Sequence, residues 1–204
     1  MEFLKYFISL LVIVDPFFAA VIVSTIANSI TEVKSIGKGV TLTFLVASLI
    51  TILFGEAFLK LIGVSVFSIK IFGGLILLHM AFQMLQAHKP KTKHTDREEE
   101  AVYEKSNISV IPIGIPILFG PGAFTTLLIF REEASTLFSM FQLVLAVLSL
   151  AVIIYFSILN SLFFSKRLGP TGIGVMMRVF GLFTGALGSQ FVVDGIKHLW
   201  MEGQ

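Results

Sequence analysis

Apolar stretches long enough to cross a lipid bilayer dominate this sequence, and they limit the folds open to it. A membrane-spanning helix needs about 20 predominantly apolar residues. Six stretches meet this requirement: 3–28, 38–59, 61–87, 107–130, 137–164 and 170–200. Charged residues make up 14% of the chain, whereas soluble domains carry about 25%. We therefore predict an all-α polytopic membrane protein with six transmembrane helices, which has the lipid bilayer as a partner.

One long polar stretch, residues 88–106, divides the chain into two halves. Three predicted helices precede it in residues 1–87 and three follow it in 107–204, and its mixed charges favour a loop outside the membrane. The absence of cysteine excludes disulfides and thiolate metal sites. Because we find no catalytic constellation, phosphate loop or metal-ligand spacing, we expect no enzymatic activity, no cofactor and no metal. The net charge of +2 gives no reason to expect a nucleic-acid partner.

Positive charges are spread unevenly over the predicted loops, and cytoplasmic loops are the ones enriched in Lys and Arg. The loops after the first, third and fifth helices hold nine: Lys34, Lys38, Lys89, Lys91, Lys93, Arg97, Lys105, Lys166 and Arg167. The opposite side holds four: Lys5, Lys60, Arg131 and Lys197. We therefore predict a cytoplasmic loop at 88–106 and both termini outside, in a bacterial inner or archaeal plasma membrane. The first helix is too long for a signal-peptide core, so we expect it to be retained.

The two halves also resemble each other in sequence. Residues 12–20, VIVDPFFAA, align with residues 117–125, ILFGPGAFT, so that Asp15-Pro16 falls on Gly120-Pro121. Residues 70–75, KIFGGL, align in a similar way with residues 178–183, RVFGLF. Because each half has three spans, the second half enters the membrane from the opposite side. Two inverted triple-helix repeats of this kind are typical of secondary transporters, although channels also contain them.

Helix-breaking residues stand at matching places in the two halves. Proline removes a backbone donor and glycine tolerates unwound backbone, and such breaks inside a membrane point to a substrate site. A half-helix that begins after Pro121 would present free N–H groups and a partial positive charge to a carboxylate. We predict a substrate site that contains Asp15, Pro16, Gly120, Gly122, Ala123, Thr125 and Thr126. The alternative is that these residues only kink packing helices.

Three charged residues fall inside the predicted spans, where charges are rare and mark function by default. Asp15 either binds substrate or a proton, or forms a structural ion pair with Arg178 or Lys70. For Lys70 and Arg178 we favour a structural role as charge partners, bonded to carbonyl groups that the breaks leave free.

Glycines cluster in the third and sixth predicted helices. Gly73 and Gly74 are predicted to let a small ligand approach the backbone, or to act as a hinge. Gly181, Gly185 and Gly188 follow the small-residue spacing of close helix packing. Packing is the favoured interpretation for the last two, and Gly181 is kept among the candidate substrate-site residues.

These motifs resemble the MarC family of integral membrane proteins, which includes the SnatA-like amino-acid transporters. The resemblance rests on Asp15-Pro16, KIFGGLILLHMAFQML at 70–85, PIGIPILFGPGAFTTLL at 112–128 and RVFGLFTGALGSQFVVDGI at 178–196. It implies six spans in two inverted halves with broken helices. It also implies transport of small neutral amino acids such as glycine and alanine, with export as the direction in some members. The family usually has Asn-Pro where this chain has Asp15-Pro16, and Asp can ionise where Asn cannot.

We therefore expect a secondary transporter of small neutral amino acids that works by alternating access, with a proton or Na+ as the candidate coupling ion. The alternatives are a channel or pore for a small solute, and a structural or regulatory membrane protein.

Overall fold

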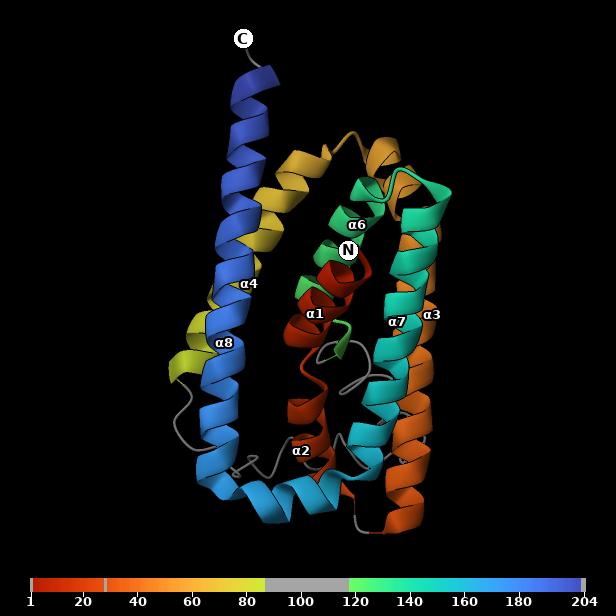
Figure 1. Ribbon diagram of the computed structural model, residues 1–204, viewed down its shortest axis with the longest axis vertical. Coiled ribbons are helices and arrows are strands. Elements are labelled where there is room, and N and C mark those ends of the chain that lie inside the picture. The colour runs from red at the N-terminus through yellow and green to blue at the C-terminus, as the bar shows by residue number, and fades with distance from the viewer. Residues whose placement is uncertain (1, 28, 87–117, 203–204) are drawn as a thin grey trace.

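The computed structural model describes residues 2–27, 29–86 and 118–202, and these residues form helices without a strand (Figure 1). The helices are α1 Glu2–Val14, α2 Pro16–Ile26, α3 Ile30–Ile62, α4 Val66–Gln86, α6 Pro121–Glu133, α7 Leu137–Leu159 and α8 Ser161–Glu202. Five described stretches are long and apolar enough to cross a membrane: Glu2–Ile26, Ile30–Ile62, Val66–Gln86, Leu137–Leu159 and Thr171–Trp200. The chain is therefore an all-α polytopic membrane protein.

The fourth predicted span, 107–130, lies partly outside the described residues, and the predicted loop 88–106 lies wholly outside them. Residues 118–130 of that span are described, and most of them belong to α6, which continues to Glu133. Six spans and an inverted repeat therefore remain predictions.

Caps and glycines set the helix boundaries and shift them from the predicted ones. The helix α3 begins at Ile30 rather than 38, because the Ser29 hydroxyl accepts a hydrogen bond from Glu32 N at 3.1 Å. It ends at Gly63, whose left-handed backbone (φ 72°) is a common helix stop. The helix α4 therefore begins at Val66 rather than 61, which places Lys70 in its second turn.

Two further differences occur in the second half. The fifth predicted span ends at Leu159 rather than 164, because the chain turns at Asn160. The following helix, α8, bends at Gly169, whose φ of 59° interrupts the helical backbone.

Three groups of helices make up the molecule (Figure 1). The helices α1, α2 and α6 lie at its centre, α4 and α8 pack together on one side, and α3 packs with α7 on the other. The buried core joins the centre to the α3–α7 side through fully buried residues such as Leu10, Phe44, Leu127, Leu150 and Ile154. The outward faces of the long helices carry exposed apolar side chains, among them Leu53, Phe72 and Leu182, as expected of surfaces that contact lipid.

Glycines bring α4 and α8 into backbone contact. A Cβ atom added at Gly74 would lie 2.6 Å from the carbonyl oxygen of Gly188. One added at Gly188 would lie 2.8 Å from that of Gly74. Gly181 faces Met84 and Gly185 faces Ala81. The small-residue pattern thus serves close packing, as predicted for Gly185 and Gly188.

Candidate functional site

The first break in the centre of the molecule lies at Asp15, between α1 and α2. Its φ of 42° and ψ of 69° are left-handed, a conformation that non-glycine residues seldom adopt and that Asn and Asp tolerate best. The Asp15 carboxylate caps α2 by accepting a hydrogen bond from Phe18 N at 3.1 Å. Pro16 follows as the first residue of α2, where its missing N–H and fixed φ suit a helix start.

The second carboxylate oxygen of Asp15 has no hydrogen-bond partner among the described residues. Asp15 is 4% exposed, and its Oδ2 atom is buried. A buried carboxylate oxygen without a partner is unfavourable, more so inside a membrane. Oδ2 is therefore the atom of this residue that is available to a bound cation, an ammonium group or a proton.

A second helix end, which has no side-chain cap, lies at the start of α6. Gly120 is the N-cap residue with extended backbone (φ −79°, ψ −177°), and it contributes no side-chain cap. The first-turn N–H groups of a helix have no carbonyl partner within the helix, which applies here to Gly122 and Ala123. These N–H groups and the helix dipole together favour an anion at this end.

Two threonines follow in α6, Thr125 and Thr126, and they differ in whether the hydroxyl group already has a hydrogen-bond partner among the described residues. The Thr126 hydroxyl donates to the carbonyl oxygen of Gly122 at 2.8 Å and is fully buried. Thr125 is also buried, and it faces Gly73 of α4: a Cβ atom at Gly73 would lie 2.7 Å from Cβ of Thr125 and would overlap its methyl group. Gly73 therefore makes room for Thr125.

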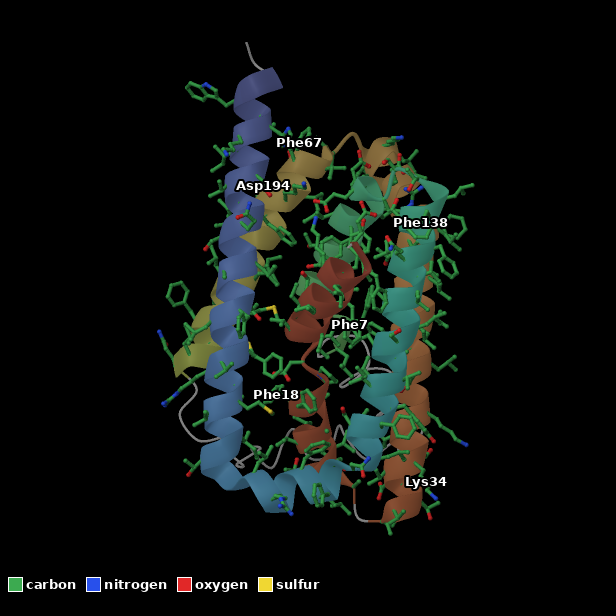
Figure 2. All side chains as sticks on the ribbon, viewed as in Figure 1. Phe7, Phe18, Lys34, Phe67, Phe138 and Asp194 are labelled. Atoms are coloured by element: carbon green, nitrogen blue, oxygen red, sulfur yellow. The ribbon has the colours of Figure 1, made fainter. Side chains whose placement is uncertain are left out.

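The start of α6 packs beside the end of α1. A Cβ atom at Gly122 would lie 3.4 Å from Cγ2 of Ile13 and 2.8 Å from Cδ2 of Leu77 on α4. Both the α1–α2 break and the start of α6 lie near the middle of the molecule (Figure 1). Phe7 on α1 and Phe18 on α2 mark the two sides of the first break (Figure 2).

The structure thus brings part of the predicted site together and separates the rest. Gathered around the two breaks are Asp15, Pro16, Gly73, Gly120, Gly122, Ala123, Thr125 and Thr126. Gly74 and Gly181 lie at the α4–α8 contact instead. A direct role of any of these residues in binding stays a prediction.

The two predicted charge partners lie in different surroundings. The Nζ atom of Lys70 is 3.4 Å from Oε1 of Glu133, and Arg178 is exposed on α8. Within the described parts of the chain, Asp15 forms no ion pair with either of them.

Sequence reasoning did not anticipate the acidic partners of Lys70, Lys5 and Arg131. Glu133 at the end of α6 lies 2.6 Å from Nζ of Lys5, in addition to its contact with Lys70. Arg131 lies 3.3 Å from Glu56. The available signal was the charged run REE at 131–133, directly after an apolar stretch. Among the described residues, no group of three or more His, Asp or Glu side chains could hold a metal ion.

Comparisons with known proteins give a consistent result. The family described as "MarC family integral membrane protein" matches residues 1–200. A UPF0056 membrane protein of Aquifex aeolicus is 33% identical over 202 residues, covering 97% of this chain and 93% of the relative. Another from Methanocaldococcus jannaschii is 32% identical, covering 95% of this chain and 97% of the relative. YhcE of Escherichia coli, also a UPF0056 membrane protein, is 26% identical, covering 97% and 93%. No solved structure matches the chain.

Proposed function

This chain belongs to the MarC family of integral membrane proteins, and on that premise we propose that it is a secondary transporter of small neutral amino acids. The names of its relatives state membrane location and no activity, so the proposal rests on the site. Its main support is the placement of an unpartnered buried carboxylate oxygen and a helix N-terminus without a side-chain cap near the middle of the molecule.

The two features suit the two charges of an amino acid. The substrate carboxylate would bind the N–H groups of Gly122 and Ala123, at the positive end of α6. The substrate ammonium would bind Oδ2 of Asp15 in a charge-assisted hydrogen bond. The hydroxyl of Thr125 is a further candidate contact.

The packing around this site supports a small substrate. The space beside Gly122 is occupied by Leu77, Met80 and Ile13, and the space beside Gly73 by Thr125. Glycine and alanine have the smallest side chains, so they need the least space beside their ammonium and carboxylate groups. Long or branched amino acids would require several of these side chains to move.

Burial favours a transporter over a channel. Asp15, Gly122 and Thr125 are all buried, whereas a conducting pore would place its binding residues along a water-filled path. Transport by alternating access would be assisted by two inverted triple-helix repeats that move against each other. A proton or Na+ would provide the coupling, and both termini would lie outside.

The test is counterflow in proteoliposomes. Vesicles that contain the purified protein and are preloaded with unlabelled glycine should accumulate labelled glycine from outside, and the rate should saturate. Glycinamide, which lacks the carboxylate, should compete poorly. Flux that does not saturate and shows no counterflow would instead favour the channel. Absence of flux for every small amino acid would favour the structural or regulatory role.

A glycine variant tests the site itself. Gly122→Leu would place a side chain against Leu77 and close the approach to the α6 N–H groups, so we expect loss of glycine exchange. Gly174→Leu is the matched control, because a Cβ atom there meets nothing within 4 Å. Normal exchange by Gly122→Leu would show that the α6 break is only a kink.

A further inference from the structure

The last turn of α6 is bound to two other helices through one carboxylate. Oε2 of Glu133 lies 2.6 Å from Nζ of Lys5 on α1. Oε1 of the same residue lies 3.4 Å from Nζ of Lys70 on α4. The Lys70 side chain is only 11% exposed, compared with 56% for Lys5. One acidic side chain therefore joins the end of α6 to the first and third membrane spans.

A second residue of the same turn is bound to α3. Nη2 of Arg131 lies 3.3 Å from Oε2 of Glu56, and its Nε donates to the carbonyl oxygen of Ile52 at 3.0 Å. We use the term α6 latch for the five charged residues of these contacts: Lys5, Glu56, Lys70, Arg131 and Glu133. The latch connects α6 to all three spans of the first half of the chain.

Aromatic residues close the core beneath the latch. Tyr6 and Phe130 are each 1% exposed, and their ring centroids are 4.8 Å apart. Phe191 of α8 meets Phe130 edge-on at 6.4 Å. Nζ of Lys5 lies 5.6 Å from the centroid of the Phe130 ring, which joins the latch to this layer. These rings pack around Phe130, which lies on α6 between its start and the latch residues Arg131 and Glu133.

We propose that the α6 latch is a gate, which seals the candidate site toward the face of the molecule at which α6 ends. The inference rests on the proposed transport function. Because α6 is a half-length helix with the site at its start and the latch at its end, release of the latch would let its last turn move away from α1, α3 and α4. Partly exposed ion pairs contribute little to stability, so they can break and re-form during each transport cycle.

Cross-linking tests the gate directly, and the natural absence of cysteine makes introduced ones unique. Lys5→Cys with Glu133→Cys, bridged by a short bis-methanethiosulfonate, should abolish glycine exchange, and a reducing agent should restore it. Glycine-dependent thermal stabilisation in detergent should persist, because the opposite face can still open. The control is Gln190→Cys with Asp194→Cys, a hydrogen-bonded pair within α8, whose cross-link should leave exchange unchanged. Full exchange with the Lys5–Glu133 bridge in place would overturn the proposal.

A readout without substrate separates this inference from the transport function. In a chain whose only cysteine is Thr125→Cys, Glu133→Gln should raise the rate of labelling by a water-soluble maleimide by about fivefold. Glu132→Gln, the same loss of charge at the exposed neighbouring residue, should not change it. Equal effects of the two variants would overturn the gate. Absence of glycine exchange in the unmodified protein would contradict the proposed function. The labelling result would still test the gate, because it does not depend on transport.

Discussion

At the scale of a single residue, position 15 combines three requirements. The backbone there is left-handed, a side-chain oxygen caps α2, and a second oxygen is buried without a partner. Asn and Asp both tolerate left-handed backbone and both cap helices well. Only Asp can supply a negative charge. Either residue can therefore occupy this break, and only Asp adds a charge to it.

Substitutions of Asp15 can test the backbone, the cap and the charge one at a time. Asp15→Asn should keep the fold and weaken glycine binding by about 1.5–3 kcal/mol, the value of a hydrogen bond to a charged group. Transport by the unmodified protein should fall as pH falls, because a protonated carboxyl cannot pair with the ammonium group. Transport by Asp15→Asn should not follow pH in this way. Measurement of exchange across a pH series checks this, and an unchanged profile would exclude Asp15 from binding.

Asp15→Ala should destabilise the protein, unlike Asp15→Asn. It removes the cap, which contributes about 1 kcal/mol, and places a residue with low tolerance in left-handed backbone at roughly 1–2 kcal/mol. Asp15→Gly is the control, since glycine adopts this backbone without strain and loses only the cap. Thermal unfolding in detergent should rank the variants in the order Asn, Gly, Ala. Equal stability of Ala and Asn would show that the break needs neither the cap nor the special backbone.

The contact between Gly73 and Thr125 gives a second prediction at this scale. Gly73→Ala would overlap the Thr125 methyl group, and overpacking of this kind costs about 1–3 kcal/mol. Thr125→Ser removes that methyl group, so the double variant should recover part of the lost unfolding free energy. A melting-temperature cycle over the four proteins measures the coupling. Strictly additive effects would mean that the two residues do not touch.

At the scale of helices, end signals determine the membrane spans more than hydropathy does. The predicted boundary between the second and third spans lies at Lys60. The helix α3 instead ends at Gly63 in left-handed backbone, and the Ser65 hydroxyl accepts from Ser68 N at 3.1 Å as α4 starts. At the other end of α3, the polar residues Glu32 and Lys34 continue the helix beyond the apolar run.

Two glycine substitutions should therefore have effects of opposite sign. Gly63→Ala should lower stability by roughly 1–2 kcal/mol, because alanine resists left-handed backbone, even though no atom would clash with the new methyl group. Gly174→Ala, within α8 and equally free of clashes, should raise stability by roughly 0.5–1 kcal/mol, since glycine weakens a helix interior. Thermal unfolding in detergent checks both. A stabilising Gly63→Ala would contradict the assigned helix end.

At the scale of the whole molecule, the fold class and the helix breaks were predictable from sequence. The contacts between residues on different helices were not. Apolar length alone identifies a helical membrane protein, and proline marks both breaks, in Asp15-Pro16 and in Gly120-Pro121-Gly122. The pairing of Lys70 with Glu133 joins residues 63 positions apart, and it depends on how α4 packs against α6. Sequence placed Gly74 beside Gly73 in the candidate site. Cβ atoms added at these two positions would point in different directions around α4, one toward Thr125 and the other toward Gly188.

The predicted orientation can be tested at described, exposed positions. Lys34 on α3 and Phe138 on α7 lie at opposite ends of the molecule (Figure 2). Lys34→Cys should resist a membrane-impermeant maleimide in intact cells and react after permeabilisation, because the excess of Lys and Arg marks its side as cytoplasmic. Ser135→Cys, close to Phe138 in sequence, should react in intact cells. The reverse pattern would invert the topology.

The left-handed backbone at residue 15 also bears on how such a protein can change over generations. Codons for aspartate and asparagine differ at a single base, and both residues fit the break without strain. One point mutation can therefore add or remove a charge between α1 and α2 while α2 keeps its cap. Lineages that carry this architecture can explore charged and neutral sites in a single inherited step, without passing through a misfolded ancestor.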